Sequence, residues 1–453
     1  ATPFAVHPTA PRTSWTIMRD LLFRVQAARE RAAFETEYVL PLAGAEILAG
    51  ENPVYLRVPT LQEAPLRRGD ELPVCRRGEK GVVAEFKVEI NDRNAIIGSL
   101  TWEEVPEAIT SDHYAASGNT GVPRYLAELM IACASWYRQH NRFESAAANA
   151  FLGIDDFELQ DAAGNEVNED LDDSQRRAWA NAVNPHNALA LIQGPPGTGK
   201  THVLVEILKT LAERGKRVLV TAPSNTAVDN ICRRAIALGL PILRAGRVEG
   251  RIAPDVARAA WMNNLQAVNR VQQRRQGDTI IYAGTHLGLL RDDVVRAEME
   301  VKDLFDVILF DESGMAHFDE LLGCIRMAHR AVLLGDHRQL PPFPLPPALL
   351  SRLRRNFVIP RSQLAMLNQS PLQWLMEERS LPVFVLRSSY RCQNPRLMRF
   401  SSVLFYEAQV KASLGADYYR LPFNERWQKY PASTLRLYST SGLPHAVRHE
   451  NLN

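Results

Sequence analysis

Five short, continuous apolar runs in the middle of the chain constrain its fold more than any other feature. In order along the sequence they are ALALIQ (188–193), RVLVTA (217–222), TIIYAG (279–284), VILF (307–310) and AVLLGD (331–336). Helical patterns separate most of them, such as HVLVEILKTLAERG, in which apolar residues recur on one face. Continuous apolar strands that alternate with helices are typical of a parallel sheet covered on both faces. The sequence therefore predicts an α/β fold.

The remainder of the 453-residue chain differs in pattern, and its length suggests about three domains. Short β-rich runs between two helical patterns near the start indicate a small barrel carried on a helical stalk. A stretch rich in Arg, Gln and Asn indicates a helical insertion, and a second α/β region begins at about 350. The expected parts are a helical stalk with a β-barrel-like module at 1–150 (barrel about 50–108), a first α/β domain at 151–346 (insertion about 247–277), and part of a second α/β domain at 347–453.

Composition limits the classes of protein that fit this chain. Hydrophobic residues make up 46% and charged residues 23%, the balance of an ordinary globular protein. The net charge of +2 means that any nucleic-acid contact depends on local basic surface. No run reaches the roughly 18 to 20 apolar residues that span a bilayer, so we expect no membrane partner. Five scattered cysteines without a CxxC pair fit a reducing, intracellular location, cytoplasmic or nuclear.

The segment GPPGTGKT matches the phosphate-binding pattern G-x-x-x-x-G-K-[ST], and it lies between a predicted strand and a predicted helix. Its residues are Gly194, Pro195, Pro196, Gly197, Thr198, Gly199, Lys200 and Thr201. We expect the backbone N–H groups to surround the phosphates of ATP, Lys200 to reach the β- and γ-phosphates, and Thr201 to bind Mg²⁺. The loop alone leaves kinases, GTPases, transporters and motors open.

The strand VILF runs directly into two adjacent carboxylates, Asp311 and Glu312. One interpretation is a solvated turn at the end of a strand. The other is a metal and water site, in which Asp311 positions Mg²⁺ and Glu312 polarises the attacking water as general base. The phosphate loop favours the second interpretation. An adjacent pair of this kind also favours hydrolysis over phosphate transfer to a small molecule.

Further motifs occur in a fixed order around these two. They are LDDSQRRA (171–178), TAPSNTAVDN (221–230), AGTH (283–286), DESGMA (311–316), GDHRQLPP (335–342) and SYRCQNPRLMRFSSVLFYEAQV (389–410). In this order they resemble the motifs of superfamily 1 helicases, most closely the Upf-like branch, over about 171–410. The resemblance implies a P-loop RecA-like domain followed by a second RecA-like domain. The N-terminal stalk and barrel fit the same branch by layout.

The resemblance also implies roles for residues that bind the nucleotide. Gln175 would read the edge of the adenine, and Tyr390 would stack on it. Gln339 would sense the γ-phosphate and couple it to nucleic acid. Arg391 would act as an arginine finger, delivered by the second RecA-like domain, because a guanidinium suits the charge of a phosphoryl transition state.

A second group of residues would contact single-stranded RNA or DNA. This group comprises Ser224, Asn225, Thr226, Thr285 and Pro342. Small hydroxyls and amides suit backbone contacts that ignore base sequence. The alternative for the residues of TAPSNTAVDN and for Thr285 is ordinary helix capping and loop turns.

The leading interpretation is an ATP-dependent helicase or translocase that moves 5′ to 3′ on a single strand. An ATP-gated nucleic-acid-binding or scaffold subunit of a larger ribonucleoprotein or repair assembly is the alternative. A P-loop small-molecule kinase explains neither TAPSNTAVDN nor GDHRQLPP.

Two departures from the family pattern affect these expectations. Met315 stands where Gln is common, so a polar bridge between motifs is expected to be lost. The sequence after Val410 lacks the family's motif V and motif VI, so we expect an incomplete second RecA-like domain. Nucleotide binding with weak turnover and poor unwinding follows from that incompleteness.

Overall fold

The structure is a computed structural model. It describes residues 11–36, 39–50, 53–60, 66, 71–76, 82–92, 94–102, 110, 114–117, 122–156, 158–162, 168–246, 251–275, 277, 279–357, 361–392 and 395–413. The expectations that concern residues 414–453 therefore lie outside the described residues.

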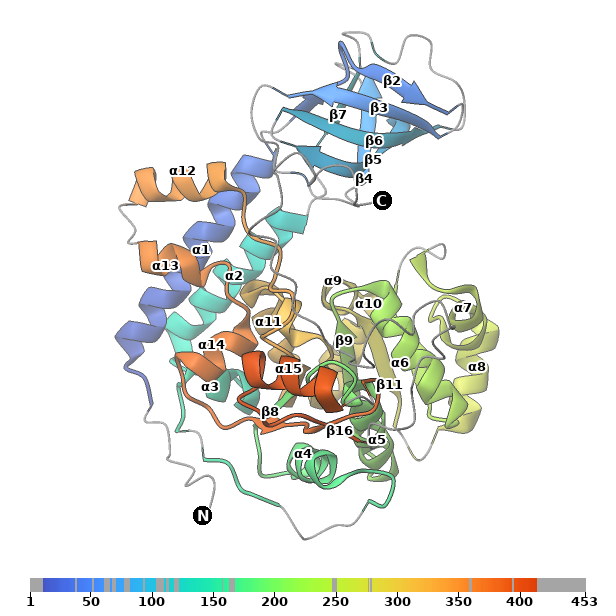
Figure 1. The fold of residues 1–453 in the computed structure, drawn as a ribbon, viewed down its shortest axis with the longest axis vertical. Coiled ribbons are helices and arrows are strands. Elements are labelled where there is room, and N and C mark those ends of the chain that lie inside the picture. The colour runs from blue at the N-terminus through green and yellow to red at the C-terminus, as the bar shows by residue number, and fades with distance from the viewer. Residues whose placement is uncertain are drawn as a thin grey trace, which may run out of the picture.

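A parallel sheet forms the centre of the molecule (Figure 1). The five apolar runs form β8 (Leu189–Gln193), β9 (Val218–Ala222), β11 (Ile281–Thr285), β12 (Phe305–Phe310) and β13 (Ala328–Gly335). Two shorter strands, β10 (Ile242–Arg244) and β14 (Phe384–Val385), complete the described sheet in the order β10-β11-β9-β12-β13-β8-β14. Every pairing in it is parallel, and β8 and β9 are buried along their whole length. The predicted α/β fold with a parallel sheet is confirmed.

Helices cover both faces of this sheet. One series of helices in mutual contact comprises α4 (Asp173–Val183), α5 (Lys200–Glu213) and α6 (Asn225–Ala237). The other comprises α3 (Ala146–Leu152), α9 (His286–Leu290), α10 (Asp293–Lys302) and α11 (Phe318–Ile325). Helices α5, α6 and α9 begin after the carboxyl ends of β8, β9 and β11, so their N-termini lie at one end of the sheet.

The N-terminal part is a stalk that carries a separate β module (Figure 1). Helices α1 (Ser14–Thr36) and α2 (Val122–His140) pack side by side, and the strands lie between them in sequence. These strands are β1 (Val39–Pro41), β2 (Glu46–Ala49), β3 (Val54–Pro59), β4 (Glu71–Arg76), β5 (Val82–Asp92), β6 (Ala95–Thr101) and β7 (Tyr114–Ser117). They pair antiparallel in the order β1-β7-β4-β5-β6-β3-β2 and enclose their own apolar core. The strands thus extend beyond the predicted 50–108 at both ends, because β1 and β7 lie outside that range and pair with each other.

Inside the stretch that the sequence marks as an insertion lie α7 (Pro254–Ala260) and α8 (Leu265–Arg274), which pack near the β10 edge of the sheet. After the sheet come α12 (Pro347–Phe357), α13 (Arg361–Met366) and α14 (Pro371–Glu377). Leu349 and Leu353 of α12 pack against Ala27 of the stalk, and β14 joins the first sheet. Residues 347–385, expected in a second domain, therefore contact the first domain and the stalk. A small unit follows, formed by α15 (Pro395–Phe405) and the parallel strands β15 (Ser388–Ser389) and β16 (Lys411–Ala412).

None of the described helices is long and apolar enough to cross a membrane.

Candidate nucleotide site

The phosphate loop connects β8 to α5 in a tight curl. Gly197 and Gly199 have φ angles of 75° and 84°, which side chains with a Cβ rarely adopt. The Thr198 hydroxyl donates to the Pro195 carbonyl at 2.7 Å, and the Gly194 N–H donates to the carbonyl of Gly335 on the neighbouring strand at 2.9 Å. The loop is therefore held in shape by its own chain, so that the start of α5 and the loop N–H groups form an anion-binding turn.

Lys200 and Glu312 face each other at this turn. The Lys200 Nζ donates to the Gly194 carbonyl at 2.9 Å and lies 3.6 Å from Glu312 Oε1. Glu312 has a φ of 52°, a left-handed conformation that is uncommon for a residue other than glycine. The predicted phosphate-binding lysine and the predicted general base are thus neighbours.

Asp311 is buried at the end of β12, with only 4% of its surface exposed. Burial, and secondarily the Glu312 carboxylate, raises its pKa to about 6, while Lys200 opposes the shift. A buried carboxylate of this kind gains from a nearby cation. Among the described residues no group of three or more His, Cys, Asp or Glu forms a metal cluster. One carboxylate with the Thr201 hydroxyl fits Mg²⁺, which takes few protein ligands and completes its shell with water and phosphate.

The segment around β15 closes on the phosphate loop from the opposite side. The Tyr390 N–H donates to the Gly197 carbonyl at 2.8 Å, and the Ser389 hydroxyl donates to the Pro196 carbonyl at 3.3 Å. A Cβ placed on Gly197 would lie 2.5 Å from Arg391 Cβ, so the two backbones are in close contact. The structure therefore brings the predicted Tyr390 and Arg391 to the loop, and Arg391 is exposed there.

Asp336 is the centre of a hydrogen-bond network that the sequence does not reveal. It is 2% exposed and accepts from Gln339 Nε2 at 2.8 Å, from Gln193 Nε2 at 3.3 Å and from the Arg338 N–H at 3.1 Å. The hydroxyl of Tyr406, the residue that follows α15, donates to the same carboxylate at 2.8 Å. The predicted Gln339 is thus anchored to a carboxylate that also binds the helix after β15.

Four of the predicted strand-binding residues lie at or after the carboxyl ends of the neighbouring parallel strands β9 and β11, and Pro342 lies in the segment after β13. Ser224 caps α6 by accepting from the Ala227 N–H at 3.2 Å, and Thr285 caps α9 by accepting from the Gly288 N–H at 3.1 Å. The capping interpretation therefore holds for both hydroxyls. Asn225 is half-buried, Thr226 is exposed and Pro342 is buried.

Comparison with known proteins finds relatives of the central part of the chain. The model of a family described as an AAA domain matches residues 170–283. The DNA replication ATP-dependent helicase/nuclease DNA2 of Saccharomyces cerevisiae is 31% identical over 246 residues, which cover 53% of this chain and 15% of that protein. The ATP-dependent helicase NAM7 of the same yeast is 29% identical over 283 residues, covering 56% and 27%. The DNA polymerase alpha-associated DNA helicase A of Schizosaccharomyces pombe is 46% identical over 216 residues, covering 39% and 32%.

The central part of the chain is thus similar to superfamily 1 helicases of the Upf-like branch. The chain spans less than a third of the length of each of these three relatives.

Gln175 supports the phosphate loop through its side-chain amide. It is 2% exposed, its Nε2 donates to the Thr198 carbonyl at 2.9 Å, and its Oε1 accepts from the Asp172 N–H at 3.2 Å. The second bond is half of a capping box at the start of α4. These bonds leave the Gln175 amide one further N–H and one further oxygen lone pair for the edge of an adenine. The Tyr390 hydroxyl donates to Asp172 Oδ2 at 2.7 Å, which joins the two predicted base-binding residues through one carboxylate.

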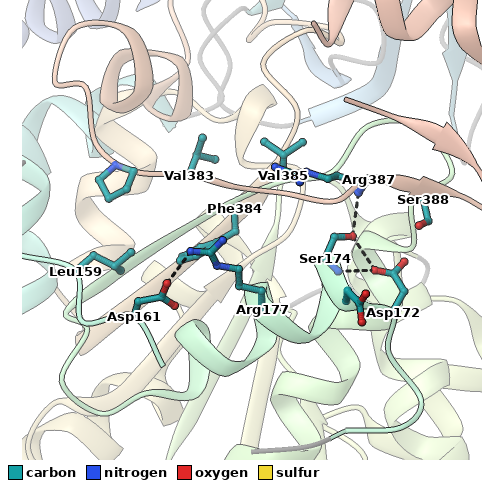
Figure 2. A pocket seen from close by; sticks show the side chains of 12 residues that line it. Leu159, Asp161, Asp172, Ser174, Arg177, Val383, Phe384, Val385, Arg387 and Ser388 are labelled. Atoms are coloured by element: carbon teal, nitrogen blue, oxygen red, sulfur yellow. Dashed lines mark hydrogen bonds and ion pairs between the residues drawn. The ribbon is translucent and has the colours of Figure 1, made fainter. Parts of the chain in front are cut away.

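A pocket of about 480 Å³ lies between α4 and the segment that contains β14 (Figure 2), and Asp172 is one of the residues that line it. Figure 2 shows Arg177 paired with Asp161 at 2.6 Å on one side, and Ser174 between Asp172 and the Arg387 N–H on the other. The volume is in the range of small-molecule pockets.

Despite Met315, a polar contact joins DESGMA (motif II) to the strand that leads into GDHRQLPP (motif III). The buried Ser313 hydroxyl donates to the Leu334 carbonyl at 2.9 Å. Gly314 lies so close to motif III that a Cβ on it would be 2.8 Å from the Asp336 carbonyl oxygen. Ser313 therefore supplies a polar contact two positions before Met315.

Proposed function

We propose that this chain is the ATP-hydrolysing part of a helicase or translocase that moves 5′ to 3′ on single-stranded RNA or DNA. The observation that carries the proposal is the closure of Tyr390 and Arg391 on Gly197 of the phosphate loop. A nucleotide bound in that loop would contact two segments that are almost 200 residues apart in sequence, so its hydrolysis would change how the segments meet.

Each catalytic residue has a defined task in this proposal. The loop N–H groups and Lys200 hold the phosphates of ATP, and Arg391 approaches them from the β15 side. Asp311 and Thr201 would hold Mg²⁺, which neutralises phosphate charge when it is bound. Glu312 orients the attacking water and takes its proton. Asp336 keeps Gln339 at the edge of the site, where it would sense the γ-phosphate.

The strand would cross the neighbouring edge formed by the ends of β9, β11 and β13. Ser224, Asn225, Thr226, Thr285 and Pro342 are the proposed contacts, and they suit a sugar–phosphate backbone because they offer no base-specific pattern. The names of the relatives include DNA helicases and a regulator of nonsense transcripts, so we propose either nucleic acid as the track. An intracellular location fits the five cysteines, which form no disulfide in the described part of the chain.

Replacement of Glu312 by Gln tests the proposal at one residue. The variant should bind a fluorescent ATP analogue with wild-type affinity and lose at least about 100-fold in steady-state hydrolysis, because the amide does not accept the proton of water. Glu213→Gln, an exposed change at the end of α5, is the matched control and should leave hydrolysis unchanged. Wild-type hydrolysis by Glu312→Gln would remove this residue from the reaction.

ATPase assays with matched single-stranded RNA and DNA, followed by unwinding of a tailed duplex, test the motor itself. Stimulation by a strand together with unwinding supports a helicase. ATP-dependent binding of a strand without any movement would instead identify a scaffold subunit of a larger assembly.

A further inference from the structure

A fully buried arginine reaches one of the proposed strand contacts from behind. Arg244, at the end of β10, has a side chain only 1% exposed, which is rare for arginine. Its Nη2 donates to Oδ1 of Asn225, the first residue of α6, at 2.8 Å. Neither residue touches the phosphate loop in the described contacts, so the nucleotide site does not explain this interaction.

The guanidinium of Arg244 is fixed on every side. Its Nε donates to Asp229 Oδ1 at 2.9 Å, and the Asp229 side chain is only 5% exposed. Its Nη1 donates to the Ala245 carbonyl. The second oxygen of Asp229 accepts from the Ala253 N–H at 2.8 Å, just before α7. The ion pair therefore joins α6, β10 and the start of the α7 segment, and it leaves Arg244 no freedom to turn away from Asn225.

The chemistry of arginine determines which way the Asn225 amide points. A guanidinium has only hydrogen-bond donors, so the group that faces it must be the amide oxygen. The Asn225 NH₂ group then faces away from Arg244, at a half-buried position between the exposed residues Ser224 and Thr226. Among the described contacts this NH₂ group makes no hydrogen bond. It is a donor without a protein acceptor at a half-buried position.

We propose that Arg244 is a positioning residue for strand binding, which holds the Asn225 amide with its NH₂ group outward to donate to a phosphate oxygen of a single strand. The proposal rests on the proposed function, because it requires a strand to cross this edge. The donor suits a phosphate of RNA or DNA equally. The Ala253 N–H, just before α7, helps to hold Asp229 against Arg244. The insertion would therefore influence strand affinity without touching the strand.

Two changes at Asn225 test the orientation of the amide, using labelled oligo-uridine and oligo-thymidine as probes. Asn225→Ala removes the donor. Asn225→Asp places one oxygen on Arg244 and the other, with a negative charge, toward the phosphates. Asp should therefore lose about tenfold more strand affinity than Ala. It should melt no lower than wild type, because a carboxylate beside Arg244 and at a helix N-terminus is stabilising. Equal affinities for Asp and Ala, or for Asp and wild type, would overturn the inferred orientation.

A double-mutant cycle tests whether Arg244 acts through Asn225. Arg244→Gln should weaken strand binding in the wild-type background and have almost no further effect in Asn225→Ala, whereas a general structural role would give additive losses. Arg233→Gln is the matched control, since it removes the same charge from an exposed pair between Arg233 of α6 and Asp255 of α7. It should retain strand binding, and both arginine variants should retain affinity for a fluorescent ATP analogue.

The outcomes separate the two levels of the proposal. If Arg244→Gln does not fold, the comparison of Asn225→Asp with Asn225→Ala still decides the orientation. A wild-type chain that binds the ATP analogue but neither oligonucleotide overturns the proposed function and this inference together. A wild-type chain that binds strand, with additive losses in the cycle, overturns the inference alone.

Discussion

At the scale of single residues, the buried carboxyl group of Asp311 lowers the stability of the folded chain at neutral pH. Its pKa in the folded chain is about 6, compared with an ordinary value of 3.8, because burial disfavours its charge. The folded chain therefore keeps a proton between these two values that the unfolded chain releases. The stability linked to this proton is fully present below about pH 4 and is lost as pH rises through about 6, a change of about 3 kcal/mol.

Asp311→Asn should remove this dependence. The variant should be more stable than the nucleotide-free wild type at pH 7, by up to about 3 kcal/mol, and its urea midpoint should change less between pH 4 and 6.5. The same variant should lose magnesium-dependent nucleotide binding. Parallel pH profiles of the two proteins would show that Asp311 is charged in the folded chain over this whole range.

The residues that the sequence predicts and those that it misses differ in how their partners are specified. Lys200 and Asp311 belong to local patterns, in which a few neighbouring residues and a strand end define the role. Asp336, Tyr406 and Arg244 take their roles from partners far away in sequence. The Tyr406 hydroxyl meets Asp336 across 70 positions, and no periodicity or motif encodes that contact.

At the scale of elements, α15 is coupled to motif III by a single hydroxyl. Tyr406 is buried at the end of this helix and donates to Asp336, which also holds Gln339. Movement of α15 would therefore shift Asp336 and, with it, Gln339, the residue proposed to sense the γ-phosphate. This link gives the second segment a physical route to the nucleotide site that does not pass through Tyr390 or Arg391.

Tyr406→Phe should weaken this route and leave the site intact. Asp336 keeps its bonds to Gln193 and Gln339, so affinity for ATP should stay at the wild-type value. Stimulation of hydrolysis by a single strand should fall by about threefold to tenfold, and the free energy of unfolding by about 1 kcal/mol. Phe405→Leu, an exposed change at the neighbouring position, is the control. Full stimulation in Tyr406→Phe would place the coupling elsewhere.

At the scale of the whole molecule, the chain has separate apolar cores for the barrel and for the sheet with its stalk. Leu56, Phe86 and Leu100 belong to the barrel core, whereas Ile17 of α1 and Met130 of α2 belong to the core of the central sheet. Alternation in short strands predicted the module, and apolar runs predicted the sheet. The sequence did not predict that α12 would pack on α1 or that β14 would join the first sheet. Those contacts form between short, weakly patterned segments, and tertiary packing decides them.

The division into two cores predicts the result of removing the barrel. The barrel is attached to the rest of the chain through the stalk helices. Its described contact with the insertion is an exposed ion pair between Glu71 and Arg251, which contributes roughly 0–1 kcal/mol. Helices α1 and α2 would still pair if a Gly-Ser linker replaced residues 39–117. The shortened chain should therefore unfold within about 3 °C of the main wild-type transition in calorimetry and should bind the ATP analogue as tightly. Arg251→Gln, with the barrel retained, should give the same midpoint. A collapse of the main transition only in the shortened chain would show that the barrel supports the ATPase fold through the stalk.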